Sequence, residues 1–556
     1  MNKIMKKPSN IIYIVFVLGI LLYLGSIIWI NLNGRQWFGF DIYSDAMTAK
    51  YMSESRSFFP DNWVFGNQYY IVATPVIAAL INFFLQDAYL SLEIASCIMT
   101  LLTVGCYIWC IKPFVNNKSL IVGLFCLIGG TIFGIDAANN TDGLQVFFTM
   151  ASYYSCYVIG ILFTLGLWLR LYTNKNINFI CIIVAILLNL SLGMQSLRET
   201  LVLNIPLCML AVYVFLIEKK EKINNKEILM SKGNLFIVSM LIANLFGIFL
   251  IKLFTNIFKI NNHTILKDVS SNLFENIQHS FSEFLVYTGL NISSTSRVEI
   301  FHFISSLFVL SVVLYSLFSI FKSHCKTPVS FLVIFCLLSL SAVFFAGIFV
   351  IKVRTIYFFV WYLLVTFSFV YVSEKVLETT FEKRHIRYKL YIVSLLTLLL
   401  IGFGNYYSNF RFDFISYNAK KEFYKKMTAE LQANDIKYLY SDWQVNEAGV
   451  VSAFSNSDII RGTFVFNNFN DKGLVSHVKY LCSEDWYKSE HSEHSYIMLS
   501  DKSLEFLDND VSAEYREEIF SNLTFQYKTK YEYAGETITY YFYKGSDKFY
   551  DDLMNN

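Results

Sequence analysis

Long apolar runs dominate this sequence and constrain its fold more than any other feature. Of the 556 residues, 55% are hydrophobic and only 16% are charged, which is too apolar for an ordinary soluble domain. A membrane-crossing helix needs roughly 20 predominantly apolar residues, and about eleven runs meet that length. They cover residues 11–31, 91–111, 119–135, 145–169, 178–195, 200–217, 234–256, 301–321, 329–351, 355–374 and 389–406. The sequence therefore predicts a mostly α-helical bundle that crosses a membrane many times.

One further apolar run, residues 69–85, is short and contains Pro75 near its middle. The positions of Lys and Arg decide whether it crosses, because short cytoplasmic loops collect these residues. If the run does not cross, the basic loops lie on the same side as the basic N-terminus. If it does cross, every basic loop after the N-terminus moves to the other side. We therefore expect a re-entrant or interfacial helix at 69–85, a cytoplasmic N-terminus and an outer domain at 407–556.

This topology places charged residues from several separate connections at the outer membrane face. They are Asp41, Asp45, Asp136, Asp142, Arg198, Glu199, Lys352 and Arg354. A charge in the middle of a bilayer costs about 2.5–3.5 kcal/mol on insertion scales, and the apolar runs contain very few ionisable residues. The chemistry of the protein is therefore expected at the outer rim of the bundle.

The stretch "GFDIYSDAMTAKYM", residues 39–52, holds two of these acids four residues apart. On a helix, Asp41 and Asp45 would share one face and repel each other by a few tenths of a kcal/mol. One interpretation is a helix start whose acids favour the dipole and cap free amides. The other is a carboxylate that takes a proton or holds a cation beside the membrane.

Three further groups of residues have both a structural and a functional interpretation. Trp63, Gln68 and Tyr69 lie in an aromatic and amide-rich loop, typical of a membrane-surface belt or of a sugar-binding surface. Asp136 and Asp142 belong either to a polar turn or to the same site as Asp45. The basic residues Arg198, Lys352 and Arg354 are on the face that the positive-inside rule disfavours, and they bind either an anion or lipid headgroups.

The order of these features resembles the GT-C superfamily, bacterial polytopic membrane glycosyltransferases that use polyprenyl-phosphate-linked sugars. It is close to the bacterial oligosaccharyl and aminoarabinose transferase type, whose first outer loop carries a pattern similar to "SD-A…A-x-x…FP…W-x-G-Q-x-Y". The matching residues are Ser44, Asp45, Ala46, Phe59, Pro60, Trp63, Gly66, Gln68 and Tyr69. Asp142, with Asp136 nearby, matches a second acid before the fourth span. Arg354 with Tyr357 is similar to an Arg-Tyr pattern that opens a late span.

The resemblance covers residues 1–406 and implies a GT-C-like membrane domain with a first outer loop at 32–90 that carries interfacial helices. Family members often place a glutamate soon after the "GQ-Y" element, whereas this chain has Thr74 and Pro75 there. The family fold is a polytopic helical bundle in the bacterial plasma membrane. Its partners would be a polyprenyl-phosphate-sugar donor, a cell-envelope glycan acceptor and membrane lipids.

The activity that the resemblance implies is inverting transfer of one sugar from undecaprenyl phosphate to an acceptor outside the membrane. Asp45 would be the general base on the acceptor hydroxyl. Asp41, Asp136 and Asp142 would orient the acceptor or hold a divalent cation, Mg or Mn. Arg354, Arg198 and Lys352 would bind the departing lipid phosphate. Trp63, Gln68 and Tyr69 would contact sugar.

The last 150 residues turn polar and predict a small α/β domain. "AKKEFYKKMTAELQAN" has the pattern of an amphipathic helix. The segments "IKYLYSD", "IIRGTFVFN", "SYIMLSD", "FQYKTKYEYAG" and "ETITYYFYKG" alternate as strands do. Acceptor contact or stabilisation is its expected role, and the histidines His477, His491 and His494 lack metal-site spacing.

Other classes of function remain as alternatives. A flippase or transporter for lipid-linked sugars would favour internal repeats and charges near the midplane. An O-antigen-type polymerase would share the outer arginines without needing an acidic helix in the first loop, and a membrane scaffold would not need Asp45. The net charge of +2 and the lack of a basic cluster with interleaved aromatics do not favour nucleic acid as a partner.

Overall fold

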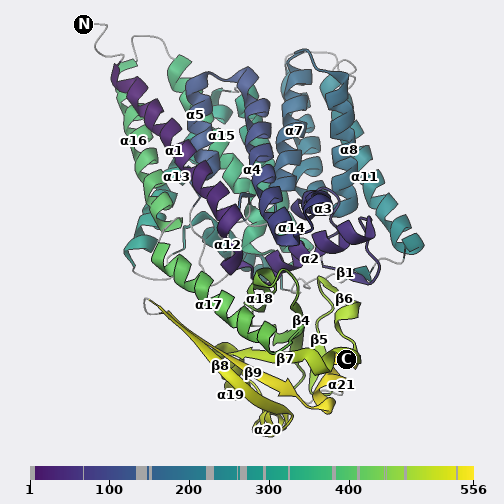
Figure 1. The fold of residues 1–556 in the computed structure, drawn as a ribbon. Coiled ribbons are helices and arrows are strands. Elements are labelled where there is room, and N and C mark those ends of the chain that lie inside the picture. Colours follow the sequence, from purple (N-terminus) through teal and green to yellow (C-terminus); the bar gives the residue numbers. More distant parts are fainter. Residues whose placement is uncertain are drawn as a thin grey trace.

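A computed structural model shows a bundle of long helices with an α/β domain at one end, and the first described helix begins at the opposite end (Figure 1). The structure describes residues 7–66, 68–132, 147–149, 153–220, 231–258, 261–262, 272–291, 296–323, 326–378, 384–409, 414–443, 445, 447–468, 473–533 and 536–556.

Within these residues, nine helical stretches are long and apolar enough to cross a membrane. They contain α1 (Lys7–Asn33), α4 (Ala88–Ile111), α7 (Ser155–Tyr172), α9 (Ile205–Lys220), α11 (Lys232–Phe258), α13 (Arg297–Ser323), α14 (Pro328–Phe349), α15 (Val360–Glu378) and α16 (Arg384–Asn409). Two shorter apolar helices, α5 (Asn117–Phe125) and α8 (Phe179–Gln195), coincide with two more of the predicted runs. The chain is a multi-pass membrane protein, and the predicted helical fold is confirmed.

Two of the predicted spans have different boundaries in the structure. Within the run at 145–169, the described helix α7 begins at Ser155. Upstream of it, the carbonyl of Phe148 accepts hydrogen bonds from the side chains of Asn31 and Thr100, both at 2.8 Å. The run at 119–135 continues from α5 into the π-helix η3 (Cys126–Gly130). There Gly129 has a φ of 152°, a conformation that side chains rarely adopt, and the regular helix stops.

The run at 69–85 contains a single described helix, α3 (Thr74–Leu85), of 12 residues. At a rise of 1.5 Å per residue it is about 18 Å long, shorter than the hydrocarbon core of roughly 30 Å. Pro75 does not interrupt this helix but lies in its first turn, where the missing amide costs no hydrogen bond. The helix packs against α2 (Phe40–Ser55) and α4, in agreement with the predicted non-crossing segment.

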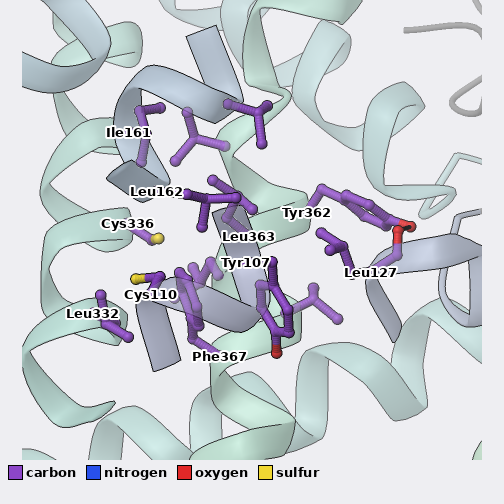
Figure 2. Close-up of a cluster of buried hydrophobic side chains, with 14 of the residues drawn as sticks. Tyr107, Cys110, Leu127, Ile161, Leu162, Leu332, Cys336, Tyr362, Leu363 and Phe367 are labelled. Atoms are coloured by element: carbon purple, nitrogen blue, oxygen red, sulfur yellow. Dashed lines mark hydrogen bonds between the residues drawn. The ribbon is translucent and has the colours of Figure 1, made fainter. Parts of the chain in front are cut away.

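The core of the bundle is a close-packed apolar cluster shared by α4, α7, α14 and α15 (Figure 2). Tyr107 stacks on Phe367 with ring centroids 6.0 Å apart. The phenol of Tyr362 lies 2.9 Å from the carbonyl oxygens of Cys126 and Leu127, so it satisfies backbone groups at the π-helix. The site described below is therefore built on a rigid set of helix ends.

The α/β domain is a six-stranded mixed sheet with strand order β5-β4-β3-β7-β9-β8. The strands are β3 (Tyr438–Asp442), β4 (Ile460–Phe466), β5 (Val475–His477), β7 (Ser495–Ser500), β8 (Leu523–Tyr533) and β9 (Glu536–Gly545). The helices are α17 (Phe414–Ala433), α18 (Ala448–Phe454), α19 (Asp501–Asn509), α20 (Ala513–Ser521) and α21 (Asp547–Asn555). The predicted helix and all five predicted strands are present, whereas β5 and the four short helices were not predicted.

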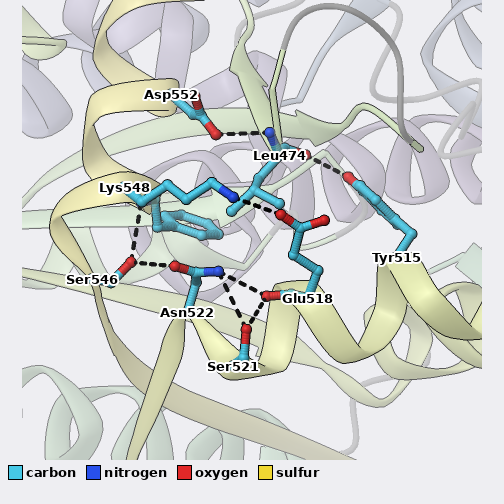
Figure 3. Close-up of polar contacts among 9 residues, drawn as sticks. Leu474, Tyr515, Glu518, Ser521, Asn522, Ser546, Lys548 and Asp552 are labelled. Carbon is cyan, nitrogen blue, oxygen red and sulfur yellow. Dashed lines mark hydrogen bonds and ion pairs between the residues drawn. The ribbon is translucent and has the colours of Figure 1, made fainter.

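Polar contacts close the C-terminal end of this domain (Figure 3). The amide of Leu474 donates to a carboxylate oxygen of Asp552 at 2.8 Å, and its carbonyl accepts from the phenol of Tyr515. Ser546 donates to Asn522 at 2.7 Å. These bonds fasten α20 and α21 to the sheet, so the last residues of the chain belong to the folded domain.

The first outer loop and the α/β domain pack into one shared core. Strand β1 (Trp63–Phe65) pairs antiparallel with β6 (Cys482–Ser483), and parallel with β2 (Asn261–Asn262). Trp486 donates to the phenol of Tyr51 at 3.0 Å, and the amide of Arg461 donates to the phenol of Tyr43 at 3.1 Å. Although the predicted division at residue 406 separates these segments in sequence, they form one unit in space.

Gly66 is a sensitive point of this interface. A Cβ atom there would lie 2.8 Å from Cζ of Tyr480, whose ring packs on the glycine backbone. We expect Gly66→Ala to lower stability by about 1–3 kcal/mol through overpacking, seen as a lower Tm of the purified protein. Gly105→Ala is the matched control, because nothing lies within 4 Å of the atom it would add. An equal change of Tm in both variants would contradict the close packing of Tyr480 on Gly66.

Candidate functional site

Helix α2 places the two acids of the first outer loop. Its N-cap is Gly39, and no side chain accepts a hydrogen bond from the amides of the helix start. Asp41 and Asp45 therefore do not act as N-cap residues. They lie one turn apart in different surroundings: Asp45 is only 1% exposed, whereas Asp41 is exposed to solvent. The helix therefore presents one accessible acid and holds a second beneath it.

Asp45 is held by a single strong hydrogen bond. The phenol of Tyr70 donates to its Oδ1 at 2.7 Å. Burial raises the pKa of Asp45 well above its usual value; the Tyr70 hydrogen bond opposes that rise, and the nearby charge of Asp41 adds to it. A carboxylate in these surroundings gains a proton readily, which is the property of a general base.

Asp41 is within electrostatic range of two guanidinium groups. Its carboxyl is solvent-accessible but closely surrounded, and burial raises its pKa, while the charges of Arg354 and Arg461 hold the pKa down. Arg354 comes from the connection between α14 and the 3-10 helix η6 (Thr355–Phe358), and Arg461 from β4 of the α/β domain. Asp41 therefore joins the membrane bundle to the outer domain electrostatically.

Arg198 lies in the short connection between α8 and the π-helix η5 (Thr200–Asn204). Its Nη1 donates to Oε1 of Gln68 at 2.8 Å. The guanidinium also faces the rings of Tyr154 and Tyr357, with centroids 5.4 and 5.5 Å away. Burial lowers the pKa of Arg198, but the neighbouring tyrosines outweigh it and the net shift is upward, so the group stays charged.

The structure treats the predicted residues differently. Asp41, Asp45, Arg354, Arg198 and Gln68 gather at the end of the bundle that meets the α/β domain. The phenol of Tyr480 is affected by charges of both signs. Burial raises its pKa, the charge of Asp41 raises it further, and the charges of Arg198 and Arg354 lower it. The resulting pKa is about 12. Lys352 is exposed beside Arg354, and among the described residues it has no recorded contact with the acids. Asp136 and Asp142 lie outside the described residues.

The aromatic residues predicted to contact sugar are part of the packed interface. Trp63 is 1% exposed and packs on Tyr51 and Trp486, with centroids 5.2 and 5.6 Å away. Tyr69 is 7% exposed and packs on Phe59 and Phe65. Their rings are thus occupied by protein contacts, and of the three predicted residues only Gln68 reaches the charged groups.

Two crystal structures align with nearly the whole chain. ArnT from Cupriavidus metallidurans in the apo state matches with a TM-score of 0.53 and 9% identity, over 96% of this chain and 98% of ArnT. ArnT bound to undecaprenyl phosphate matches with a TM-score of 0.51 and 9% identity, over 95% and 97%. This chain has the ArnT fold. No protein-family model and no curated protein matches the sequence.

This likeness to ArnT confirms the fold that the loop motif led us to expect. The likeness extends through the α/β domain, because the alignment covers nearly all of both chains. The motif resemblance reached only residue 406. The ArnT fold thus includes the outer domain that supplies Tyr480 and Arg461 to the site.

Several residues of the site were not predicted from the sequence. Tyr70 ends the aromatic loop and could have been chosen as a hydrogen-bonding partner of an acid. Arg461 and Tyr480 are more distant, since each is at least 400 positions after Asp41. Only the ArnT fold brings the outer domain onto α2.

Glu199, next to Arg198, does not add a charge to this site. It is fully buried, and neither carboxyl oxygen has a hydrogen-bond partner among the described residues. Burial raises its pKa well above the usual value, which favours the neutral acid. The charge balance at this end of the ArnT fold therefore depends on the arginines and the α2 acids.

The described residues do not form a divalent-cation site by themselves. No group of three or more His, Cys, Asp or Glu side chains is placed to hold a metal in the described part of the chain. The charged groups that lower the pKa of Asp41 are the guanidiniums of Arg354 and Arg461. The predicted Mg or Mn stays a proposal, and no step below depends on it.

The burial of Asp45 predicts a pH-dependent stability cost. Because its folded-state pKa is raised, the folded protein favours the protonated acid, and stability falls as pH rises from the unfolded-state pKa towards the raised one. Asp45→Asn removes this titration. We expect the variant to have a Tm a few degrees above that of the wild type at pH 8 and a similar Tm near pH 4. Glu54→Gln, an exposed acid of the same helix, should show no such trend, and a pH-independent difference would contradict the prediction.

Proposed function

We propose that this protein is an inverting glycosyltransferase that moves a sugar from a polyprenyl-phosphate donor to an acceptor outside the cytoplasmic membrane of a bacterium. The observation that carries the proposal is that the charges of Asp41, Asp45, Arg198 and Arg354 all act on one phenol, that of Tyr480. These groups come from separate connections, and they meet in a protein with the ArnT fold. One ArnT structure holds undecaprenyl phosphate, which supports a polyprenyl phosphate as the lipid partner.

In the proposed reaction, an acceptor hydroxyl attacks the anomeric carbon of the donor sugar. Asp45 takes the proton of that hydroxyl as the new C–O bond forms. The bond between the anomeric carbon and the phosphate oxygen breaks, and the electron pair leaves with the lipid phosphate. Tyr70 keeps the carboxylate oriented through its 2.7 Å hydrogen bond. Because Asp45 is buried, the acceptor reaches it when neighbouring side chains part on substrate binding.

The leaving phosphate gains negative charge as the bond breaks, and fixed positive charges lower the energy of that state. Arg198 and Arg354 would supply these charges, and exposed Lys352 would add charge at the rim. Gln68 holds the Arg198 guanidinium at 2.8 Å, and Tyr154 packs against it. A preoriented arginine offers two parallel donors to a phosphate.

The proposed orientation puts the N-terminus in the cytoplasm and the α/β domain outside the plasma membrane. Basic loops then lie at the cytoplasmic ends of the helices. Arg170 and Lys175, for example, lie at the end of α7, opposite the end that bears the acids (Figure 1). The acceptor is then a cell-envelope glycan or a related polymer.

The function is tested with purified protein in lipid nanodiscs, a panel of undecaprenyl-phosphate-linked hexoses and cell-envelope glycan. Transfer predicts sugar in the glycan with inverted anomeric configuration, and one undecaprenyl phosphate released per sugar. A transporter would leave every donor chemically intact, and that result with all hexoses and acceptors would overturn the proposal.

A further inference from the structure

Three aromatic side chains from both parts of the protein meet beside the acidic face of α2. Phe40, the first residue of α2, lies 4.8 Å from Trp443 and 6.1 Å from Tyr480, measured between ring centroids. Trp443 and Tyr480 are 6.3 Å apart. Phe40, Trp443 and Tyr480 thus form one contiguous cluster, which we call the aromatic platform.

The platform is partly open to solvent, unlike the packed aromatic core behind it. Trp443 is 42% exposed, whereas Trp63 and Trp486 are 1% and 3% exposed. Phe40 and Tyr480 are half-buried. Packing explains the buried tryptophans, but it leaves much of the Trp443 ring in water, which is costly for so large an apolar group.

Charged groups border the platform. Asp41 follows Phe40 in the chain, and its charge is the strongest one acting on the Tyr480 phenol. The Arg461 guanidinium lies 4.9 Å from the centre of the Phe40 ring. Arg461 is itself held by Ser441 and by the carbonyl of Val445, at 3.3 and 2.9 Å. An open aromatic surface therefore lies next to a carboxylate and a fixed guanidinium.

We propose that the aromatic platform is a stacking subsite for a pyranose ring of the acceptor, with Asp41 receiving hydrogen bonds from its hydroxyls. One face of a pyranose presents C–H groups, which pack on the electron-rich face of an aromatic ring. The rim of the same ring carries hydroxyls, which need acceptors and donors such as Asp41 and Tyr480. Few other ligands combine an apolar face with a polar edge in this way.

The position of the platform favours the acceptor sugar over the donor sugar. Trp443 and Tyr480 belong to the outer domain, whereas Arg198 and Arg354, which would hold the lipid phosphate, come from the helix ends of the bundle. A glycan arriving from outside meets the outer domain first. The assignment to the acceptor rests on the proposed function, but the capacity to bind a pyranose does not.

Binding can be measured without knowing the natural acceptor. The probes are methyl pyranosides of the gluco, galacto, manno and N-acetylglucosamine series, observed by saturation-transfer NMR with the full-length protein in nanodiscs. At least one should show transfer concentrated on the C–H groups of one ring face. Trp443→Ala should reduce that signal at least tenfold, and Trp443→Phe should retain most of it.

Matched variants separate this result from misfolding and from failure of the proposed function. Trp37→Ala removes a tryptophan of equal exposure, 43%, from the 3-10 helix η1 (Arg35–Trp37) and should leave binding unchanged. Asp45→Asn should also bind the pyranoside, even though it blocks transfer. No binding by any probe, or equal binding after Trp443→Ala in a protein that keeps its wild-type Tm, would overturn the subsite.

A competition experiment distinguishes the two sources of sugar. Undecaprenyl phosphate alone should not displace the bound pyranoside, and neither should undecaprenyl-phosphate-linked glucose if the platform receives the acceptor. Displacement by the linked sugar but not by the lipid phosphate would assign the platform to the donor and overturn the acceptor assignment.

Discussion

Replacing Asp45 by Asn is expected to lower the rate of sugar transfer by about 10³-fold, within the range that general-base catalysis supplies. Asparagine has nearly the same shape and can still accept the hydrogen bond from Tyr70, so the fold of α2 should be kept. It cannot take the proton of the acceptor hydroxyl. The measurement is the initial rate of label transfer from the undecaprenyl-phosphate donor to the glycan, at saturating concentrations of both substrates.

Two variants of the same helix are the comparisons for this result. Glu54→Gln, at the exposed end of α2, should transfer sugar at the wild-type rate. Asp41→Asn should cost roughly tenfold, because this acid orients the acceptor without taking its proton. Asp41 is the more accessible of the two acids, so a larger loss in Asp41→Asn than in Asp45→Asn would move the general base to Asp41. Full activity in both variants would exclude the α2 acids from catalysis.

Replacing Arg198 by Ala should reduce kcat/KM for the lipid donor by at least about 30-fold. Truncating one partner of a buried, hydrogen-bonded charge pair costs about 2–5 kcal/mol or more. In this substitution the lost partner is the guanidinium proposed to pair with the lipid phosphate. Arg198→Lys should recover only part of the loss, because an ammonium lacks the planar fork of two donors. Binding of undecaprenyl phosphate to the purified variants measures how much of the loss arises from weaker lipid-phosphate binding and how much from the transfer step.

Arg297→Ala is the control for this substitution. Arg297 is an exposed arginine at the start of α13, and its loss should change neither donor binding nor transfer. If Arg198→Ala weakened pyranoside binding instead of lipid-phosphate binding, the arginine would belong to the acceptor side and the proposed division of the site would be wrong.

The helical fold was predictable because its main determinant is local. A run of about 20 apolar residues specifies a membrane helix almost without regard to its neighbours, and Lys and Arg in the loops specify sidedness. The sequence did not predict details that depend on residues far away in the chain. The carbonyl of Phe148, for example, accepts hydrogen bonds from the side chains of Asn31 and Thr100, and no pattern in residues 145–169 reveals those partners.

The site was predictable in its charges and not in its surroundings. Asp45, Arg198 and Arg354 are conspicuous because each charge lies where a membrane protein has reason to avoid one. Trp63 and Tyr69 looked similar to exposed sugar-contacting rings, but the outer domain covers them. The same domain brings Arg461 and Tyr480 to the acids, and contact between residues so far apart in the sequence has no local signature.

The pairing of β1 with β6 has a consequence for biosynthesis. Trp63 is made early, but its partner Ser483 is made 420 residues later, about 20–80 s at synthesis rates of 5–20 residues per second. Throughout that interval the edge of β1 has no partner strand from the C-terminal region. A nascent chain that is released too early therefore exposes an unpaired strand edge and the ring of Trp63, which chaperones and proteases can recognise.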